Sequence, residues 1–435
     1  MKYYSTNGKV EPVSFKEAIF KGLPDDNGLF MPQEIPSLPS SFFEEISELT
    51  LPEIGFEVIK QFIDGEIQDI ELKSLIEDVL SFNIPLKKIK NGVYALELFH
   101  GPTLAFKDVG ARFLARSLSY FTKQEDKKLT VLVATSGDTG SAVANGFYNV
   151  PNIDVIILYP SGKVSKFQEQ QMTTIGGNIT ALEVDGTFDD CQKLVKDAFL
   201  DEELKSALNL TSANSINMAR LLPQSVYYFY AWAQLSEEEK KNAVFSIPSG
   251  NYGNLSAGLI AQRMGLPIKH FLACSNTNDT VPMYLWNGNF EPKASVATIS
   301  NAMDVGNPSN FVRMLELFNG SHSKMSESIT GYAYTDESTR QTIQKVYALT
   351  GYILDPHGAV GYMGLIDYLK IANGTGIVLE TAHPVKFNQT VEEEIGMKVA
   401  LPSHVESTNL KKRSIPFEKD FKGFKRFLLA LSQTY

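Results

Sequence analysis

Lys107 is the residue whose type and setting best suit covalent chemistry. It lies in the run H-G-P-T-L-A-F-K-D at residues 100–108, between Phe106 and a helical pattern of apolar residues that begins at Asp108. Partial burial at such a junction lowers a lysine pKa from about 10.4, and the neutral amine can then form a Schiff base with a carbonyl group. An ordinary surface lysine is the competing interpretation, and these nine residues alone do not decide between the two.

A glycine-rich loop at residues 249–254 has the features of an anion site. It follows an apolar strand at 243–247 and opens a helical pattern at 255–264, with Asn254 as the expected helix cap. Amides at a helix N-terminus bind anions, and glycines let the backbone approach a ligand closely. The run matches neither GxGxxG nor GxxxxGK[ST], so a single phosphate group fits better than a nucleotide. A tight turn without a ligand is the alternative.

Further polar loops follow other predicted strands, at residues 136–140 (S-G-D-T-G), 162–165 (G-K-V-S) and 381–384 (T-A-H-P). Taken singly, such motifs are weak: a run like 162–165 is more often a solvated loop, and a lone histidine such as His383 is more often packed or hydrogen-bonded than catalytic. Parallel sheets bind ligands at the carboxyl ends of their strands, which is where all these loops lie. A phosphorylated carbonyl cofactor joined to Lys107 would use them together, and pyridoxal 5′-phosphate is such a cofactor.

Composition excludes several other functions. A net charge of −10 argues against a nucleic-acid or anionic-membrane surface. No apolar run approaches the roughly 18 residues of a membrane span, and the N-terminal residues lack a signal-peptide pattern. The two cysteines, Cys191 and Cys274, lie in apolar contexts without metal spacing, so a cytoplasmic protein with no disulfide and no catalytic metal is expected. No GxSxG elbow supports a serine triad.

The positioning elements are predicted to form an α/β fold. Apolar strands at 130–135, 154–159, 179–184, 243–247 and 376–380 alternate with helical patterns, which indicates parallel sheets covered on both faces. We expect a mainly helical N-terminal domain at 1–95, α/β domains at 96–235 and 236–400, and a helical C-terminal tail at 401–435.

These motifs together closely resemble the threonine synthase family, in its bacterial and fungal branch with a long N-terminal domain. The resemblance rests on the lysine and glycine-rich loops and also covers residues 26–32, 212–220, 301–305 and 381–384. It implies a fold-type II, tryptophan-synthase-β-like pyridoxal-phosphate enzyme. Such an enzyme is a carbon–oxygen lyase acting on phosphates, which converts O-phospho-L-homoserine and water to L-threonine and phosphate by β,γ-elimination and β-replacement, the last step of threonine biosynthesis.

The resemblance also implies roles for individual residues. Lys107 matches the Schiff-base lysine and Thr381 the hydroxyl facing the pyridine nitrogen. The loop holding the cofactor phosphate matches Ser249, Gly250, Asn251, Tyr252, Gly253 and Asn254. Ser136, Gly137 and Thr139 match the loop for the substrate carboxylate, and Asp138 borders the cofactor 3′-oxygen where many fold-type II relatives have Asn. From loop position and residue type, the candidates for the substrate phosphate are Lys163, Ser165, Asn217, Arg220 and Arg112.

Under this hypothesis the amine of Lys107, once displaced, is the general base and acid, while His100 is structural or a substrate neighbour. Three alternatives stay open. Another fold-type II enzyme, such as a serine or threonine dehydratase or a β-replacing synthase, would share the lysine and the glycine loop. A non-catalytic relative would bind the cofactor or a phosphorylated metabolite, and a Rossmann-type binder lacks its fingerprint here. The sequence does not distinguish a monomer from a homodimer.

Overall fold

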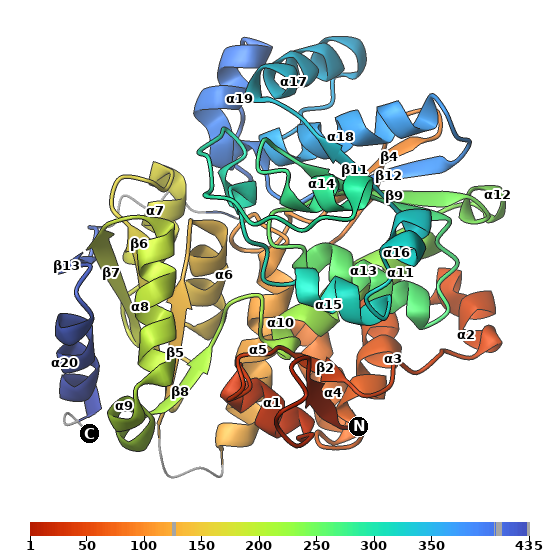
Figure 1. Cartoon of the computed structure of the whole chain (residues 1–435). Helices are drawn as coiled ribbons and strands as arrows, with labels where there is room; N and C mark the ends of the chain where they lie inside the picture. The colour runs from red at the N-terminus through yellow and green to blue at the C-terminus, as the bar shows by residue number, and fades with distance from the viewer. Residues whose placement is uncertain (124–127, 404, 406–410, 433–435) are drawn as a thin grey trace. The chain divides into compact units, whose positions relative to one another are not determined.

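Each strand predicted above overlaps a strand of the computed structural model, which describes residues 1–123, 128–403, 405 and 411–432. The chain divides into two compact units (Figure 1). The large unit comprises residues 1, 31–106 and 221–402, and the small unit comprises 2–30, 107–220 and 403–435. The chain passes between them after residue 1, within β2 (Phe30–Pro32), at the start of α5 (Lys107–Thr122), within α10 (Met218–Leu221) and after residue 402.

The small unit is built on a parallel sheet with the strand order β13-β7-β6-β5-β8. Its strands are β5 (Leu129–Ala134), β6 (Ile153–Pro160), β7 (Ile179–Asp185), β8 (Asn209–Ser212) and β13 (Ile415–Glu418). Its other elements are β1 (Tyr3–Ser5), α1 (Phe15–Lys21), α6 (Asp138–Phe147), α7 (Lys166–Thr173), α8 (Phe188–Leu200), α9 (Glu202–Ala207) and α20 (Phe421–Ser432).

Both faces of this sheet are covered. Leu132, Ile156 and Leu182 pack with residues of α8, α9 and α20 on one face. Val131 and Val155, which alternate with them along the strands, are also fully buried. The C-terminal tail is therefore not only helical as predicted, because β13 extends the sheet beside β7 before α20 begins (Figure 1). Parts of the predicted tail, residues 404, 406–410 and 433–435, lie outside the described residues.

The large unit has a sheet with the strand order β11-β10-β9-β12-β4-β3. Its strands are β3 (Leu86–Lys90), β4 (Val93–Glu97), β9 (Ala243–Pro248), β10 (His270–Ser275), β11 (Ile329–Ala333) and β12 (Thr375–Glu380). Within this sheet β3 pairs antiparallel with β4, and the other neighbouring strands pair parallel. The register places Glu380 beside Glu97 at the carboxyl ends of β12 and β4.

Helices surround this second sheet. The N-terminal ones confirm the helical character predicted there: α2 (Ser40–Glu45), the 3₁₀ turn η1 (Ile46–Glu48), α3 (Leu51–Ile63) and α4 (Asp69–Val79). The later ones are η2 (Leu222–Gln224), α11 (Ser225–Ala233), α12 (Glu237–Lys240), α13 (Gly253–Arg263), α14 (Thr280–Asn287), η3 (Asn301–Met303), α15 (Phe311–Leu317), α16 (His322–Ser328), α17 (Asp336–Thr350), α18 (Pro356–Leu369), η4 (Pro384–Phe387) and α19 (Asn388–Ile395).

The core of the large unit has a layer on each side of the sheet. On one face, α17 and α18 pack with Val244, Leu272 and Val378. On the other, Tyr228 of α11 packs against Phe245, with ring centroids 5.0 Å apart. Loops at the carboxyl ends of these strands are thus carried by a rigid, doubly covered sheet. Among the described helices, none has the length and apolar character needed to cross a membrane.

Candidate active site

The backbone that leads to Lys107 is fixed by the loop after β12. The Phe106 N–H donates to the Thr381 carbonyl at 2.9 Å, and the His383 N–H donates to the Leu104 carbonyl at 3.0 Å. Leu104 has a left-handed backbone with φ of 60°, an uncommon conformation for a branched apolar residue. Lys107, three residues after Leu104, is half-buried and is the first residue of α5. The predicted loop-to-helix junction is confirmed, and its geometry is held by a second loop distant in sequence.

Two more side chains hold the same segment. The buried ammonium of Lys386 donates to the Thr103 carbonyl at 2.8 Å, and the Tyr227 hydroxyl donates to the Phe106 carbonyl at 2.5 Å. His100 lies 2.8 Å from the Glu97 carboxylate through its Nε2 atom. This pairing gives His100 a structural partner.

The glycine-rich loop after β9 forms a turn braced by its own side chains. The Ser249 hydroxyl donates to Asn254 Oδ1 at 2.5 Å and accepts the Tyr252 N–H at 3.1 Å. Asn254 Nδ2 donates to the Pro248 carbonyl at 3.0 Å. The expectation that Asn254 caps the helix is wrong: α13 begins at Gly253, and its N-cap is Tyr252 in a left-handed conformation with φ of 58°. The side chain of Asn254 braces the turn instead.

Position 250 has no space for a side chain, so it requires glycine. A Cβ atom at this position would lie 2.6 Å from the Met303 Cα and 3.0 Å from the Ala302 carbonyl oxygen. The η3 turn therefore packs directly on the backbone of the loop. Close backbone packing at the N-terminus of an 11-residue helix is a setting in which amides can bind a phosphate.

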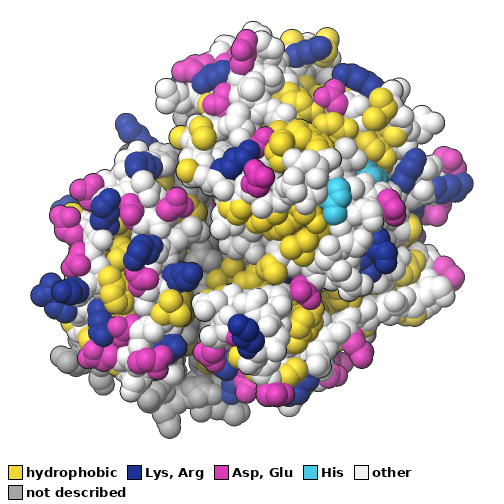
Figure 2. Space-filling view, in the orientation of Figure 1, with side chains coloured by type: hydrophobic (Ala, Val, Ile, Leu, Met, Phe, Trp, Pro, Cys, Tyr) yellow, Lys and Arg dark blue, Asp and Glu magenta, His cyan; other side chains and the backbone are white. Residues whose placement is uncertain are grey.

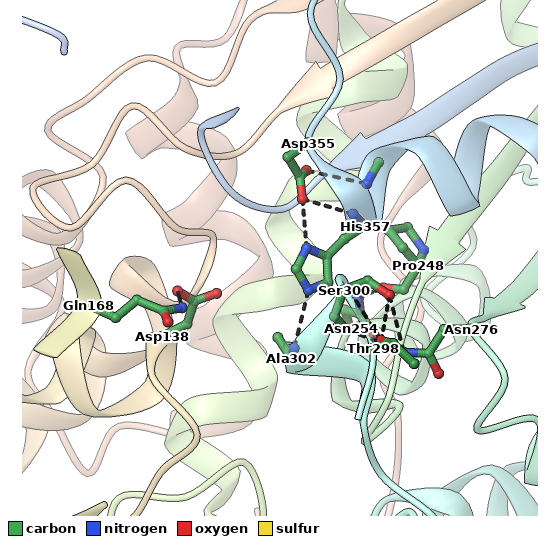
Figure 3. Close-up of polar contacts among 11 residues, drawn as sticks. Asp138, Gln168, Pro248, Asn254, Asn276, Thr298, Ser300, Ala302, Asp355 and His357 are labelled. Carbon is green, nitrogen blue, oxygen red and sulfur yellow. Dashed lines mark hydrogen bonds and ion pairs between the residues drawn. The ribbon is translucent and has the colours of Figure 1, made fainter. Parts of the chain in front are cut away.

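The loop after β5 positions Asp138 through a glutamine from α7. Gln168 Nε2 donates to Asp138 Oδ1 at 2.9 Å, and both side chains are buried (Figure 3). Gly137, with φ of 141°, leaves room for Gln168, because a Cβ there would lie 2.5 Å from its carboxamide carbon. The Thr135 hydroxyl accepts the N–H groups of Gly137 and Gly140 at 2.9 and 2.8 Å. Ser136 and Thr139 remain half-buried at the loop surface.

The five candidates for the substrate phosphate differ in their surroundings. Asn217 is buried and donates to the Ile19 and Ser212 carbonyls at 2.9 and 3.0 Å, so its amide already has structural partners. Ser165 is the N-cap of α7. Lys163 is exposed in the loop after β6.

Arg220 and Arg112 lie near the beginning of α5. Arg220 is 2% exposed and donates to the Ala213 carbonyl. Its Nε atom lies 3.2 Å from the position of a Cβ at Gly110, one turn after Lys107. Arg112 belongs to the same helix and is half-buried. These two arginines are therefore associated with α5, the helix that begins at Lys107.

Thr381 directly follows β12 and is 6% exposed. Its carbonyl accepts the Phe106 N–H, as described above, so Thr381 lies beside the segment that leads to Lys107. No group of three or more His, Cys, Asp and Glu side chains within the described residues could hold a metal ion. Burial raises the pKa of both cysteine thiols to about 12, so neither is a reactive thiolate at neutral pH.

The small unit also contains a cavity of about 360 Å³, which is lined by none of the predicted site residues. Leu129 and Asn209, the first residues of β5 and β8, line it together with Phe20, Phe199 and Lys196. It therefore opens at the amino ends of these strands, whereas the loop at residues 136–140 follows the carboxyl end of β5. The cavity is not part of the predicted site.

The sequence did not indicate a hydrogen-bonded histidine and aspartate, His357 and Asp355, that support the η3 turn. His357 Nδ1 lies 2.6 Å from Asp355 Oδ1, and His357 Nε2 accepts the Ala302 N–H at 3.2 Å (Figure 3). Asp355 is the N-cap of α18, with Pro356 as its first residue. An Asp-Pro pair before an apolar run is a recognisable helix start. It was the one feature of the sequence that could have drawn attention to this region.

Comparison with known proteins identifies the family. The family model for pyridoxal-phosphate dependent enzymes matches residues 80–379, the threonine synthase N-terminal model matches 2–80, and the threonine synthase C-terminal model matches 358–428. The chain is 47% identical to threonine synthase from Haemophilus influenzae over 430 residues, covering 99% of this chain and 100% of that protein. The chain belongs to the threonine synthase family.

Solved structures of threonine synthases have the same fold as this chain. The fold matches the Escherichia coli threonine synthase crystal structure with a TM-score of 0.93 and 44% identity, over 99% of this chain and all of that one. The pyridoxal-phosphate-bound threonine synthase of Brucella melitensis matches with a TM-score of 0.91 and 34% identity over the full length of both chains. The chain is thus a pyridoxal-phosphate-dependent lyase, as expected from its sequence.

The residues present fit the cofactor that this family uses. A hydroxyl, backbone amides and the N-terminus of α13 suit a phosphate monoester at residues 249–254, where Gly250 leaves no space for a side chain. The primary amine of Lys107, at the start of α5, is of the type that attaches a carbonyl cofactor. The surface carries both signs of charge side by side on the face seen in Figure 2, with no single basic patch.

Proposed function

We propose that the chain converts O-phospho-L-homoserine and water into L-threonine and inorganic phosphate. The observation that carries this proposal is the full-length likeness to threonine synthases, which extends through the N- and C-terminal family segments as well as the catalytic region. Dehydratases of the same fold type share a lysine and a glycine loop, so these features alone would not favour one over the other.

Individual residues have the following proposed roles. Lys107 would attach the cofactor, with its phosphate on Ser249, Gly250, Asn251, Tyr252, Gly253 and Asn254, while Asp138 borders the ring oxygen and Thr381 faces the ring nitrogen. Bound pyridoxal 5′-phosphate supplies an electron sink for the electrons left when C–H bonds of the substrate break. A neutral hydroxyl at Thr381, in place of a carboxylate, leaves the ring nitrogen less firmly protonated and the sink weaker. Such a sink suits elimination chemistry.

Lys107 moves the protons. Its amine, displaced by the substrate amine, takes the α-proton and then a β-proton, and phosphate leaves from the γ-carbon. Ser136, Gly137 and Thr139 orient the substrate carboxylate. After protonation at the γ-carbon, a water adds its hydroxyl to the β-carbon and passes its other proton to the released phosphate, and the α-proton returns from Lys107. The net reaction consumes one water and releases one phosphate, so atoms balance.

The substrate is tested by a comparison of two reactants. Purified protein with pyridoxal 5′-phosphate should release inorganic phosphate from O-phospho-L-homoserine and form equimolar L-threonine. It should produce far less 2-oxobutanoate from L-threonine, because that reaction leaves the substrate-phosphate site empty. Faster 2-oxobutanoate formation would favour the dehydratase alternative, and cofactor binding without phosphate release would favour the non-catalytic one.

We propose that Arg220 is the principal cation for the substrate phosphate, with Arg112 beside it and Lys163, Ser165 and Asn217 contributing less. Arg220→Gln should raise the KM for O-phospho-L-homoserine by about 10- to 100-fold, the usual range for a hydrogen bond to a charged group. Lys163→Ala should raise the KM less, because Lys163 is exposed and well solvated.

The inhibition constant of inorganic phosphate, measured in the same variants, reports on the site without turnover. Lys193→Ala is a matched control, because Lys193 is an exposed lysine on α8 that pairs with Asp197 at 2.6 Å. Unchanged values in both the Lys163 and the Arg220 variants would remove these two residues from the phosphate site.

A further inference from the structure

The η3 turn, residues 301–303, is held between two groups of polar side chains in the large unit. On one side, Asp304 Oδ1 accepts the Thr298 hydroxyl at 2.7 Å and Asn276 Nδ2 at 2.9 Å. Asn276 Nδ2 also donates to the Ser300 hydroxyl at 3.1 Å. Asn276 directly follows β10, whose last residue, Ser275, donates to the Ser249 carbonyl at 3.2 Å. This side of the turn is thus tied to the start of the glycine-rich loop.

On the other side, the turn has one polar attachment to α18. The Ala302 N–H donates to His357 Nε2, and His357 Nδ1 donates to Asp355 Oδ1. Asp355 is itself fixed, because it also accepts the backbone N–H groups of His357 and Gly358 at 2.9 and 3.2 Å. The imidazole is 2% exposed and lies against the Phe387 ring, with centroids 4.8 Å apart. Its tautomer is therefore set: Nδ1 carries the hydrogen and Nε2 accepts.

The backbone of the η3 turn packs directly against the backbone of the glycine-rich loop. The Cα of Met303 lies 2.6 Å from the place of a Cβ at Gly250, and the Ala302 carbonyl oxygen 3.0 Å from it. A turn that moved away by a few tenths of an ångström would leave Gly250 unsupported on that side. A loop that binds through amides needs them held within about 0.5 Å of the productive geometry.

We propose that His357 is a positioning residue for cofactor binding: through its Nε2 atom it holds the η3 turn against Gly250 and so fixes the amides of residues 249–254. This inference rests on the proposed assignment of that loop to the cofactor phosphate. His357 contacts neither substrate nor cofactor in this role. It acts through Ala302 and Met303 alone.

The test distinguishes the hydrogen bond made by Nε2 of His357 from the one made by Nδ1. An asparagine amide reaches roughly as far as Nδ1 and a glutamine amide as far as Nε2, so His357→Asn loses the acceptor for Ala302 while His357→Gln keeps it. We expect His357→Asn to raise the dissociation constant of pyridoxal 5′-phosphate at least about tenfold, and His357→Gln to stay within about threefold of the unchanged protein. The readout is cofactor titration of the apo-protein by absorbance near about 410–420 nm.

Two further variants complete the experiment. Ala302→Pro removes the donated hydrogen while leaving His357 in place, and Pro is tolerated in the first turn of a helix. It should weaken cofactor binding as His357→Asn does, and the double variant should be no weaker than either single one, because both remove the same hydrogen bond. His270→Gln is the control, since His270 begins β10 at the opposite end of the sheet and bonds only Thr330 at 2.8 Å among the described residues.

Several outcomes would overturn the inference. Wild-type cofactor affinity in folded His357→Asn, or additive losses in the double variant, would show that the contact does not reach the loop. A drop in apo-protein unfolding temperature without a change in affinity would assign His357 a purely structural role, and so would failure of both single variants to fold. If the unchanged protein itself bound no pyridoxal 5′-phosphate, the proposed function would fail instead, and the His357 variants would not be needed to show it.

Discussion

Replacing Lys107 by alanine should lower the rate of threonine formation by at least about 10³-fold and abolish the absorbance band near about 410–420 nm. Both effects have one cause under the proposed function, in which the same amine attaches the cofactor and moves the α- and β-protons. The cofactor itself should still bind, since in the proposed function residues 249–254 hold its phosphate independently of Lys107. Equilibrium dialysis with pyridoxal 5′-phosphate should therefore show retained binding in a protein without the band.

The first residue of another helix provides a matched control. Lys166 begins α7 as Lys107 begins α5, but Lys166 is exposed and Lys107 half-buried. Lys166→Ala should leave both the band and the rate unchanged. A small primary amine such as methylamine should restore part of the rate to Lys107→Ala, because it can accept the protons that Lys107 no longer accepts. Full activity in Lys107→Ala would exclude Lys107 as the base.

The sequence was most informative where function depends on neighbouring residues. The strand–loop–helix order around residues 249–254 could be predicted because the apolar run, the glycines and the helical pattern follow one another directly. The same holds for the loop-to-helix junction at Lys107, although α5 begins at Lys107 itself, one residue before the expected helical pattern. Local order along the chain determines both features.

Prediction was weakest where a partner lies far away in the sequence. The amide that fixes Asp138 comes from Gln168, 30 residues later, and one of the two hydrogen bonds donated by the Asn217 amide reaches the Ile19 carbonyl, 198 residues away. Asn254 looked like a helix cap, yet its side chain turns back to Ser249 and Pro248. Such pairings depend on the packing of whole elements, which no local pattern reports.

Glu380, the last residue of β12, is a fully buried acid that the proposed mechanism does not use. A Cβ at Gly358 would lie only 1.8 Å from its Oε1 atom, so the carboxyl group fills the space over the first turn of α18. Burial, followed by the nearby charges of Asp355 and Glu97, raises the pKa of Glu380 well above its usual value. The folded protein therefore binds a proton at Glu380 that the unfolded chain releases.

This bound proton determines whether the free energy of unfolding rises or falls with pH. Because the folded pKa is raised, the contribution of Glu380 to stability is complete below the unfolded pKa of about 4.3 and is lost as the pH rises toward the folded pKa. Over that interval the free energy of unfolding should fall by about 1.4 kcal/mol per pH unit from this group alone. Glu380→Gln, which is neutral at every pH and similar in size, should remove that slope.

We expect Glu380→Gln to gain stability relative to the unchanged protein by about 1.4 kcal/mol for each unit between pH 5.5 and 7.5, for as long as the pH stays below the folded pKa. Urea unfolding of both proteins, followed by circular dichroism at each pH, gives the difference directly. Glu418→Gln is the control, because Glu418 also ends a strand, β13, but is exposed, and it should leave the slope unchanged. Equal slopes in Glu380→Gln and the unchanged protein would mean that Glu380 is ionised in the folded state, with a cation near it in solution.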